Sequence, residues 1–170
     1  SESGIYELSN EFFSKNKKYN FEIVIGDISR RERMENLFKN LKPNIVYHAA
    51  AYKHVPLMEV NPSEAIRVNV MGTKILADLS IKTNVEKFIF ISTDKAVNPT
   101  NVMGASKRIS EMYCQSVSKT TNTKFITTRF GNVLGSNGSV IPLFKKQLES
   151  GGPITVTHKN VTRYFMTIPE

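Results

Sequence analysis

Three side chains that can donate or accept protons stand side by side at the end of one apolar run. Thr93, Asp94 and Lys95 directly follow the run 88–91, and Lys107 lies in the next helical pattern. Buried strands of α/β proteins end where these proteins bind ligands, and neighbouring ionisable groups shift each other's pKa values. The pattern therefore predicts an active site that moves protons. The local sequence leaves one alternative open, a plain turn with Lys95 in water.

Apolar runs alternate with helical patterns along the whole chain. Runs of strand length are expected at 21–25, 44–48, 87–92, 124–130 and 154–157. Apolar residues at helical spacing predict helices at 1–15, 31–41, 62–81, 103–119 and 140–150. Strands and helices that alternate at these lengths are typical of βαβ units with right-handed crossovers. We therefore predict an α/β fold with a doubly wound, Rossmann-like parallel sheet.

The chain lacks one signal that dinucleotide-binding folds normally contain. No Gly-x-Gly-x-x-Gly turn, which would bind a pyrophosphate at a helix N-terminus, occurs in the 170 residues. We therefore expect residues 1–150 to form a partial dinucleotide-binding domain without its first βαβ unit. Residues 151–170 are expected to begin a substrate-binding region, so the fold would be incomplete at both ends.

The composition argues against several classes of protein. The formal net charge is +8, but the basic residues are scattered and not interleaved with aromatic ones. We therefore expect no nucleic-acid binding and favour a small anionic substrate. No apolar run approaches the roughly 20 residues of a membrane span, so no membrane contact by this segment is expected. The single cysteine, Cys114, is expected to be buried and reduced, and the scattered histidines predict no metal site.

Several short motifs occur together in an order that resembles one protein family. They are Gly26-Asp27-Ile28, His48-Ala-Ala-Ala-Tyr-Lys-His-Val-Pro56, Asn69-Val-Met-Gly-Thr73, Ser92-Thr-Asp-Lys-Ala-Val-Asn-Pro99, Met103-Gly-Ala-Ser-Lys107, Arg129-Phe-Gly-Asn-Val-Leu-Gly-Ser136, Gly138-Ser-Val-Ile-Pro142 and Thr162-Arg-Tyr-Phe-Met-Thr-Ile-Pro169. The chain resembles the UDP-N-acetylglucosamine 4,6-dehydratases, in the polysaccharide-biosynthesis branch of the extended short-chain dehydrogenase/reductase superfamily. The Thr-Asp-Lys run is the motif that distinguishes this branch.

The resemblance implies roles for the central residues in the loss of water across the C5–C6 bond of a sugar. Asp94 would be the acid and Lys95 the base, with Thr93 bonding the C4 oxygen and Lys107 the nicotinamide ribose. As an acid, Asp94 would need a pKa raised by burial. Most of the superfamily has a tyrosine where this chain has Met103, and a thioether cannot accept the hydroxyl proton. The resemblance therefore indicates a subgroup whose catalysis has moved to other residues.

Further positions are expected to contact the cofactor or the substrate. The cofactor residues that the resemblance implies are Asp27, Ile28, Ala49, Ala50, Ala51, Asn69, Ser92 and Lys107. The substrate residues are Lys53, Asn132, Ser136, Ser139 and Arg163. Three alternatives stay open: Asp27 could stabilise a turn, the alanines could serve tight packing, and Lys53 could be solvated. Asn69 is unfavourable within a helix, and we interpret it as support that orders the site.

The implied activity is the NAD(P)-dependent dehydration of a UDP-N-acetylhexosamine to a 4-keto-6-deoxy sugar nucleotide for surface polysaccharide or glycan biosynthesis. NAD is slightly favoured over NADP. The alternatives are a sugar-nucleotide 4-epimerase and a non-catalytic dinucleotide-binding relative. The resemblance also implies a homo-oligomer formed through the helices 62–81 and 103–119, and a cytoplasmic location in a parent protein that can be anchored to the membrane. The 170 residues alone are expected to be inactive.

Overall fold

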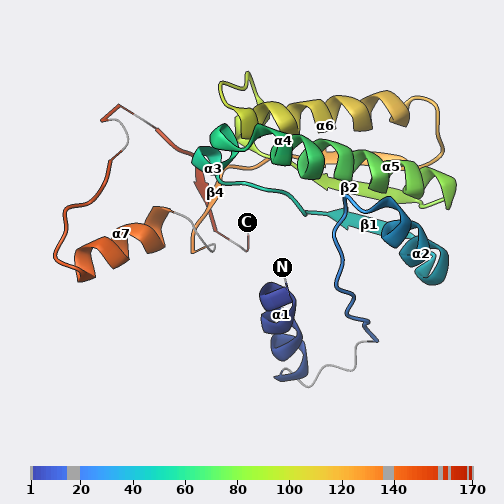
Figure 1. The fold of residues 1–170 in the computed structure, drawn as a ribbon, viewed down its shortest axis with the longest axis horizontal. Coiled ribbons are helices and arrows are strands. Elements are labelled where there is room, and N and C mark those ends of the chain that lie inside the picture. Colours follow the sequence, from blue (N-terminus) through green and yellow to red (C-terminus); the bar gives the residue numbers. More distant parts are fainter. Residues whose placement is uncertain are drawn as a thin grey trace.

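The sheet at the centre of the chain is parallel and three-stranded. In the computed structural model, which describes residues 2–14, 20–135, 140–156, 159–160, 162–167 and 169, the strand order is β1-β2-β3 (Figure 1). The strands are β1 Ile45–His48, β2 Lys87–Ile91 and β3 Lys124–Thr128. The predicted α/β class, the parallel sheet and the strands expected near 44–48, 87–92 and 124–130 are therefore confirmed.

Helices connect the strands and flank the sheet (Figure 1). The α-helices are α1 Glu2–Ser14, α2 Arg31–Leu41, α3 Val55–Val60, α4 Pro62–Ala65, α5 Thr73–Lys82, α6 Val102–Ser118 and α7 Val140–Glu149. A π-helix, η1 Ile66–Gly72, joins α4 to α5, and a 3₁₀ turn, η2 Asp94–Ala96, follows β2. Within the described part of the chain, every helix is too short or too polar to cross a lipid bilayer.

The core lies between the sheet and the helices α2, α5 and α6. Phe88 and Phe90 project from β2 into this core and are 0 % exposed. Leu79 of α5 and Cys114 of α6 pack in the same cluster, so the buried, free cysteine predicted from the sequence is confirmed. Complete burial of each phenylalanine contributes on the order of 2 kcal/mol, which fixes β2 beneath the helices that flank it.

The opposite face of the sheet is apolar and open. Side chains alternate along a strand, so the residues that flank the buried positions point to this face. Ile45 and Tyr47 of β1 are 42 % and 73 % exposed there, and Ile126 of β3 is 43 % exposed. The helices α2, α5 and α6 thus cover one face of the described sheet and leave the other in contact with solvent.

Two of the predicted strands are wrong. The segment 21–25 pairs with no described strand, and its side chains Phe21, Ile23 and Ile25 are exposed. A strand needs a neighbour for its backbone hydrogen bonds, and here Phe21 instead stacks against Phe12 and Phe13 of α1, with ring centroids 5.3 Å apart. Residues 154–156 are irregular, and residue 157 lies outside the described residues.

The structure also divides elements that the sequence predicts as continuous. The helix expected at 62–81 is α4, η1 and α5 in succession, because the chain widens to a π-helix at Ile66–Gly72. The short strands β4 Asn132–Val133 and β5 Phe165–Met166 pair in parallel. They were not predicted, because two residues are too few to show the alternation of apolar and polar side chains that indicates a strand. This small sheet brings the end of the described chain beside the segment after β3.

Candidate active site

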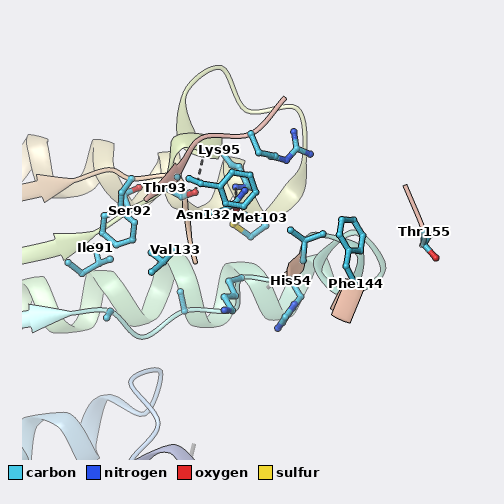
Figure 2. A pocket seen from close by; sticks show the side chains of 18 of the residues that line it. His54, Ile91, Ser92, Thr93, Lys95, Met103, Asn132, Val133, Phe144 and Thr155 are labelled. Atoms are coloured by element: carbon cyan, nitrogen blue, oxygen red, sulfur yellow. Dashed lines mark hydrogen bonds between the residues drawn. The ribbon is translucent and has the colours of Figure 1, made fainter. Parts of the chain in front are cut away.

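A cavity of about 770 Å³ opens at the carboxyl ends of β1 and β2. Ala49 and Ala51 line it after β1, and Ile91, Ser92 and Thr93 line it at the end of β2. Figure 2 shows Phe144 of α7 and Thr155 at the far end from the β2 residues. The cavity therefore lies where parallel α/β sheets place their ligands.

Many of the predicted site residues line this cavity. They are Ala49, Ala51, Lys53, Ser92, Thr93, Lys95, Met103, Asn132 and Arg163. Asp27, Ile28, Ala50, Asn69, Asp94 and Lys107 are not part of its wall. Ser136 and Ser139 lie outside the described residues, so their predicted substrate contacts stay predictions.

The turn after β2 is fixed by its own cap and by the neighbouring strand. The Thr93 hydroxyl oxygen accepts a hydrogen bond from the backbone N–H of Lys95 at 3.3 Å, which begins η2. Beyond the regular pairing of β2 with β3, Ser92 N donates to Thr128 O at 2.7 Å and Asp94 N donates to Phe130 O at 3.2 Å. The turn is thus attached to the segment that follows β3.

The side chains of this turn contact one another at the cavity wall. Lys95 Nζ donates to Asp94 Oδ1 at 2.9 Å, and the Thr93 hydroxyl donates to the same oxygen at 2.9 Å. Lys95 Nζ also lies 3.5 Å from Asn132 Oδ1. Figure 2 shows Thr93, Lys95 and Asn132 grouped on one wall. Thr93 caps this turn, as the plain-turn alternative expects, but Lys95 is paired with Asp94 and lines the cavity.

The expected pKa of Asp94 is wrong in direction. Burial alone would raise the pKa of this carboxyl, but hydrogen bonds from Lys95 and Thr93, together with the charge of Lys95, lower it below its ordinary value. An adjacent cation stabilises the ionised form of a carboxyl more than partial burial disfavours it. Asp94 is therefore ionised at neutral pH and forms a salt bridge with the side chain of Lys95.

Lys107 fastens the end of β2 to α6. Its side chain is 5 % exposed, and Nζ donates to the backbone carbonyl of Ile91 at 2.6 Å. The same ammonium lies 4.0 Å from the ring centroid of Phe90. Burial lowers the pKa of Lys107 to about 8, although the charge of Glu111 acts in the opposite direction. The contact of Lys107 with a nicotinamide ribose stays a prediction.

The buried ammonium leads to a prediction about stability. Since the folded-state pKa of Lys107 is about 8 and the unfolded value about 10.4, the folded state binds this proton less tightly than the unfolded chain. The stability of the wild-type protein should therefore rise as the pH increases from 8 to 10.4. Lys107→Met in the complete protein should be more stable at pH 7, by about 1 kcal/mol after loss of the bond to Ile91.

Urea unfolding at pH 7 and at pH 10 measures this difference, which should shrink at the higher pH. A Lys82→Met variant, altered at an exposed lysine of α5, should change stability by less than about 0.5 kcal/mol at both pH values. A lower stability of Lys107→Met at pH 7 would show that the ammonium stabilises the fold.

Comparison with known proteins identifies the family to which this chain belongs. The sequence profile of a family described as polysaccharide biosynthesis protein matches residues 1–170. The chain belongs to this polysaccharide biosynthesis protein family. It is 56% identical to the capsular polysaccharide biosynthesis protein CapD of Staphylococcus aureus over 99% of its own length, but it covers only 28% of that protein. The resemblance inferred from the motifs is therefore confirmed.

Two further family relatives carry names for enzymes. The chain is 37% identical to a UDP-N-acetylglucosamine 4,6-dehydratase (inverting) of Campylobacter jejuni, over 97% of its own length and 49% of the relative. It is 40% identical to a UDP-glucose 4-epimerase of Rickettsia rickettsii, over 85% of its own length and 42% of the relative. The chain thus spans between about a quarter and a half of the length of these relatives.

The solved structure of Pen from Bacillus thuringiensis has the same fold. It matches this polysaccharide biosynthesis chain with a TM-score of 0.89 and 39% identity, over 99% of the chain and 53% of Pen. A UDP-glucose 4-epimerase of Thermus thermophilus, solved in complex with NAD, matches with a TM-score of 0.76 and 24% identity, over 84% of the chain and 55% of that protein. The Rossmann-like fold is therefore confirmed, and at this identity the second likeness supports the fold alone.

In this family member, Asn69 joins three segments around the cavity. Its amide Nδ2 donates to Tyr52 O at 3.0 Å and to Ser106 Oγ at 2.9 Å, and its Oδ1 accepts from Tyr52 N at 2.8 Å. Both of its amide hydrogens are thus used by the protein. Asn69 connects η1 to the loop after β1 and to α6, which agrees with its interpretation as architectural support.

Asp27 and Ile28 lie in a turn that packs against η1. Asp27 accepts hydrogen bonds from Ser29 N at 2.9 Å and from Arg67 Nη1 at 3.0 Å. These hydrogen bonds and the arginine charge lower the pKa of Asp27, although burial opposes them. Ile28 contacts Gly72, where any added Cβ would collide with the isoleucine side chain. Asp27 thus stabilises a turn here, and its contact with adenine stays a prediction.

Sequence reasoning did not identify several residues of the site. Phe130, Phe144 and Phe165 form apolar parts of the cavity wall, and His54 lines it beside the predicted Lys53. Phe144 lies on α7 and Phe165 on β5, so nothing local in the sequence relates them to the turn after β2. Met103 is buried against Met58 and Ala65, which makes this position part of an apolar cluster as well as of the wall.

Proposed function

We propose that this chain is the catalytic core of an NAD-dependent enzyme that dehydrates a UDP-N-acetylhexosamine to a 4-keto-6-deoxy sugar nucleotide. The observation that carries the proposal is the pair of hydrogen bonds that Lys95 Nζ and the Thr93 hydroxyl donate to Asp94, beside the wall of a 770 Å³ cavity. The named dehydratase relative from Campylobacter jejuni supports the same reaction class. Because the chain spans about half of that relative, the activity is proposed for the longer protein.

The cavity wall suits the nicotinamide half of NAD. Ala49 and Ala51 keep the wall free of bulk where it meets the end of β1, and Ser92 provides a hydroxyl at the end of β2. Small side chains allow a flat ring to approach the backbone closely. When bound, NAD would supply reversible hydride transfer: C4 of the sugar would lose a hydride and its hydroxyl a proton to solvent, and C6 would later regain the hydride while C5 regains a proton. The residues of this chain would then bind, orient and exchange protons with the sugar.

The Asp94–Lys95 pair would provide both the acid and the base for the loss of water. Because Asp94 is ionised in the substrate-free protein, the pair would react only once the bound sugar displaces water from the cavity, which disfavours the charged forms. Moving one proton from Lys95 Nζ to Asp94 Oδ1, across 2.9 Å, would then convert the ion pair to an amine and a carboxylic acid. The amine would then remove the C5 proton, and the acid would protonate the departing C6 hydroxyl as water. The pair returns to ammonium and carboxylate, so the elimination consumes no proton from solvent.

Two cationic side chains of the cavity wall would bind the diphosphate of the substrate. Lys53 and Arg163 line the wall together with Asn132, and a cationic, partly closed wall raises the local concentration of an anion. Arg163 and Phe165 reach the cavity through the pairing of β4 with β5. We therefore propose that residues 151–170 begin the substrate-binding region.

One assay tests the proposed reaction. The complete protein is incubated with UDP-N-acetylglucosamine and the product is examined by proton NMR. A 6-methyl, 4-keto sugar nucleotide is expected, with no net reduction of NAD after many turnovers. Unchanged substrate, with NAD still bound, would contradict the proposal and favour a non-catalytic dinucleotide-binding relative.

A UDP-sugar 4-epimerase is the second candidate. The observation in its favour is the 40% identity to the named epimerase of Rickettsia rickettsii. An epimerase transfers the hydride at C4 but needs no acid–base pair at C5 and C6, so the contact of Lys95 with Asp94 would have no catalytic purpose. Inversion at C4 without a 6-methyl signal in the same NMR assay would identify this activity.

The helices predicted to form a homo-oligomer present apolar side chains to solvent. Ile109 and Met112 of α6 and Met71 of η1 are exposed. A dimer through these helices would bury them, and sedimentation of the complete protein measures its oligomeric state.

A further inference from the structure

The start of α6 lies directly against the turn formed by Thr93, Asp94 and Lys95, which we call the catalytic turn. The contact is made at Gly104. Helix α6 begins after Asn101, whose side-chain Oδ1 accepts a hydrogen bond from Gly104 N at 2.8 Å. A Cβ added to Gly104 would lie closer than 3.0 Å to the carbonyl oxygen of Lys95 and 3.1 Å from its carbonyl carbon. Cβ atoms do not approach backbone atoms this closely, so any other residue would require the two segments to separate.

Glycine at position 104 makes helix α6 less stable than alanine would. Gly104 lies inside the first turns of a helix, where glycine is about 1 kcal/mol less favourable than alanine. Its backbone φ is not positive, so its conformation does not require glycine. The close approach of Lys95 is therefore the physical reason for glycine at this position.

The catalytic turn is also hydrogen-bonded on its other side, so it cannot move away from a larger residue at position 104 without losing bonds. On its other side, Ser92 N donates to Thr128 O at 2.7 Å and Asp94 N donates to Phe130 O at 3.2 Å. Ahead of the turn, Lys107 of the same helix binds Ile91 O at 2.6 Å. The segment from Ile91 to Lys95 is thus fixed between α6 and the end of β3, and movement of Lys95 would disrupt these bonds.

We infer that Gly104 is a positioning residue for Lys95, because its missing side chain sets the distance between α6 and the catalytic turn. The inference rests on the proposed function, in which Lys95 exchanges protons with the substrate. Gly104 is not one of the residues that line the cavity, and it acts only through its contact with the backbone of Lys95. A displacement of about 1 Å at a reacting group can lower a rate about 10²-fold.

The test is Gly104→Ala in the complete protein. We expect a crystal structure of the variant to show the carbonyl of Lys95 displaced from α6 and Lys95 Nζ farther than 3.5 Å from Asn132 Oδ1. We expect kcat to fall about 10²-fold, while KM for the UDP-sugar and the dissociation constant of NAD change by less than about threefold. Loss of positioning alters the chemical step and leaves the binding residues in place.

Val85→Ala is the matched control. Val85 is 1 % exposed and precedes β2 at the end of the sheet away from the cavity. The control should lower the melting temperature and leave kcat unchanged, which separates lost stability from lost positioning. Gly104→Ala should also lower the melting temperature, because the added methyl group forces α6 and the catalytic turn apart, but of the two variants it alone should lower kcat.

Each outcome is decisive for the inference. An unchanged position of Lys95 in the variant, with unchanged kcat, would overturn it, as would accommodation of the methyl group by movement of α6 alone. Displacement of Lys95 with a lower kcat supports it. A wild-type protein that makes no dehydrated product, together with a displaced Lys95 in the variant, would refute the proposed function and still support the positioning of Lys95 by Gly104.

Discussion

Lys95→Ala in the complete protein is expected to lower kcat for dehydration by about 10³-fold or more, with little change in the affinity for NAD. The reason is that the variant lacks the amine that removes the C5 proton, and a positioned general base contributes on the order of 10²- to 10⁴-fold. Lys95 lines the cavity beside Thr93 but is not among the small residues at the end of β1 that suit the nicotinamide. Product formation by NMR and NAD binding by fluorescence titration measure the two effects separately.

Two further variants sharpen this expectation. Lys95→Arg keeps the charge beside Asp94 but cannot act as a neutral amine at accessible pH, so it should be as inactive as the alanine variant. Lys82→Ala removes an exposed lysine on α5 and should retain full activity. A loss of NAD affinity comparable to the loss of kcat would instead make Lys95 a binding residue.

The largest expected effect on stability comes from a buried carboxylate on α6. Glu111 is 0 % exposed and accepts a hydrogen bond from Arg129 Nε at 2.7 Å, while a second nitrogen of Arg129 bonds its other oxygen. Arg108 Nη1 donates to that second oxygen at 3.1 Å. This pair ties α6 to the segment that follows β3.

Glu111→Ala should destabilise the complete protein by about 2 kcal/mol, because it removes the charge-assisted hydrogen bonds between a fully buried carboxylate and Arg129, whose side chain is 35 % exposed. Urea unfolding measures the loss. Glu149→Ala, at an exposed position on α7, is the matched control and should change stability by less than about 0.5 kcal/mol. A loss as small as that of the control would show that Arg129 reaches water when Glu111 is removed.

The pH dependence of this effect has a defined sign. Burial alone would raise the pKa of Glu111, but hydrogen bonds from Arg129 and Arg108 lower it. A carboxyl with a lowered folded-state pKa stabilises the protein above its unfolded pKa, near 4.3, and this contribution is lost as the pH falls through the folded value. The difference between wild type and Glu111→Gln should therefore be largest near pH 7 and shrink below pH 4.

The predicted strands are confirmed where an apolar run has a neighbouring strand within the chain with which to pair. The strands near 44–48, 87–92 and 124–130 pair with one another, and the structure contains all three. The segment 21–25 has a similar local pattern, but the structure describes no strand beside it, so propensity alone produced no strand. Local sequence reports what a segment favours, and pairing decides whether the preference is realised.

The location of the site was predictable from the sequence, but the direction of the pKa shift of Asp94 was not. The turn Thr93–Lys95 and the alanines after β1 meet at the cavity because parallel strands end at the same edge of a sheet. The pKa of Asp94 moves in the opposite direction to the prediction, because contact with its sequence neighbour Lys95 outweighs partial burial. Gly104 and Glu111 act through segments that are distant in sequence, and no local pattern relates them to the turn.

The π-helix at Ile66–Gly72 makes one stretch of this chain intolerant of shortening. A π-helix contains one more residue per hydrogen-bonded ring than an α-helix, and here the carbonyl of Asn69 accepts hydroxyl hydrogens from Thr73 at 2.6 Å and from Ser110 at 2.7 Å. Deleting a single residue between Asn69 and Thr73 would restore an ordinary helix and rotate the preceding side chains, Asn69 included, by about 100° relative to α5. Asn69 would then face away from Tyr52 and Ser106, so aligned relatives that conserve its bonds must also conserve the residue count of this segment.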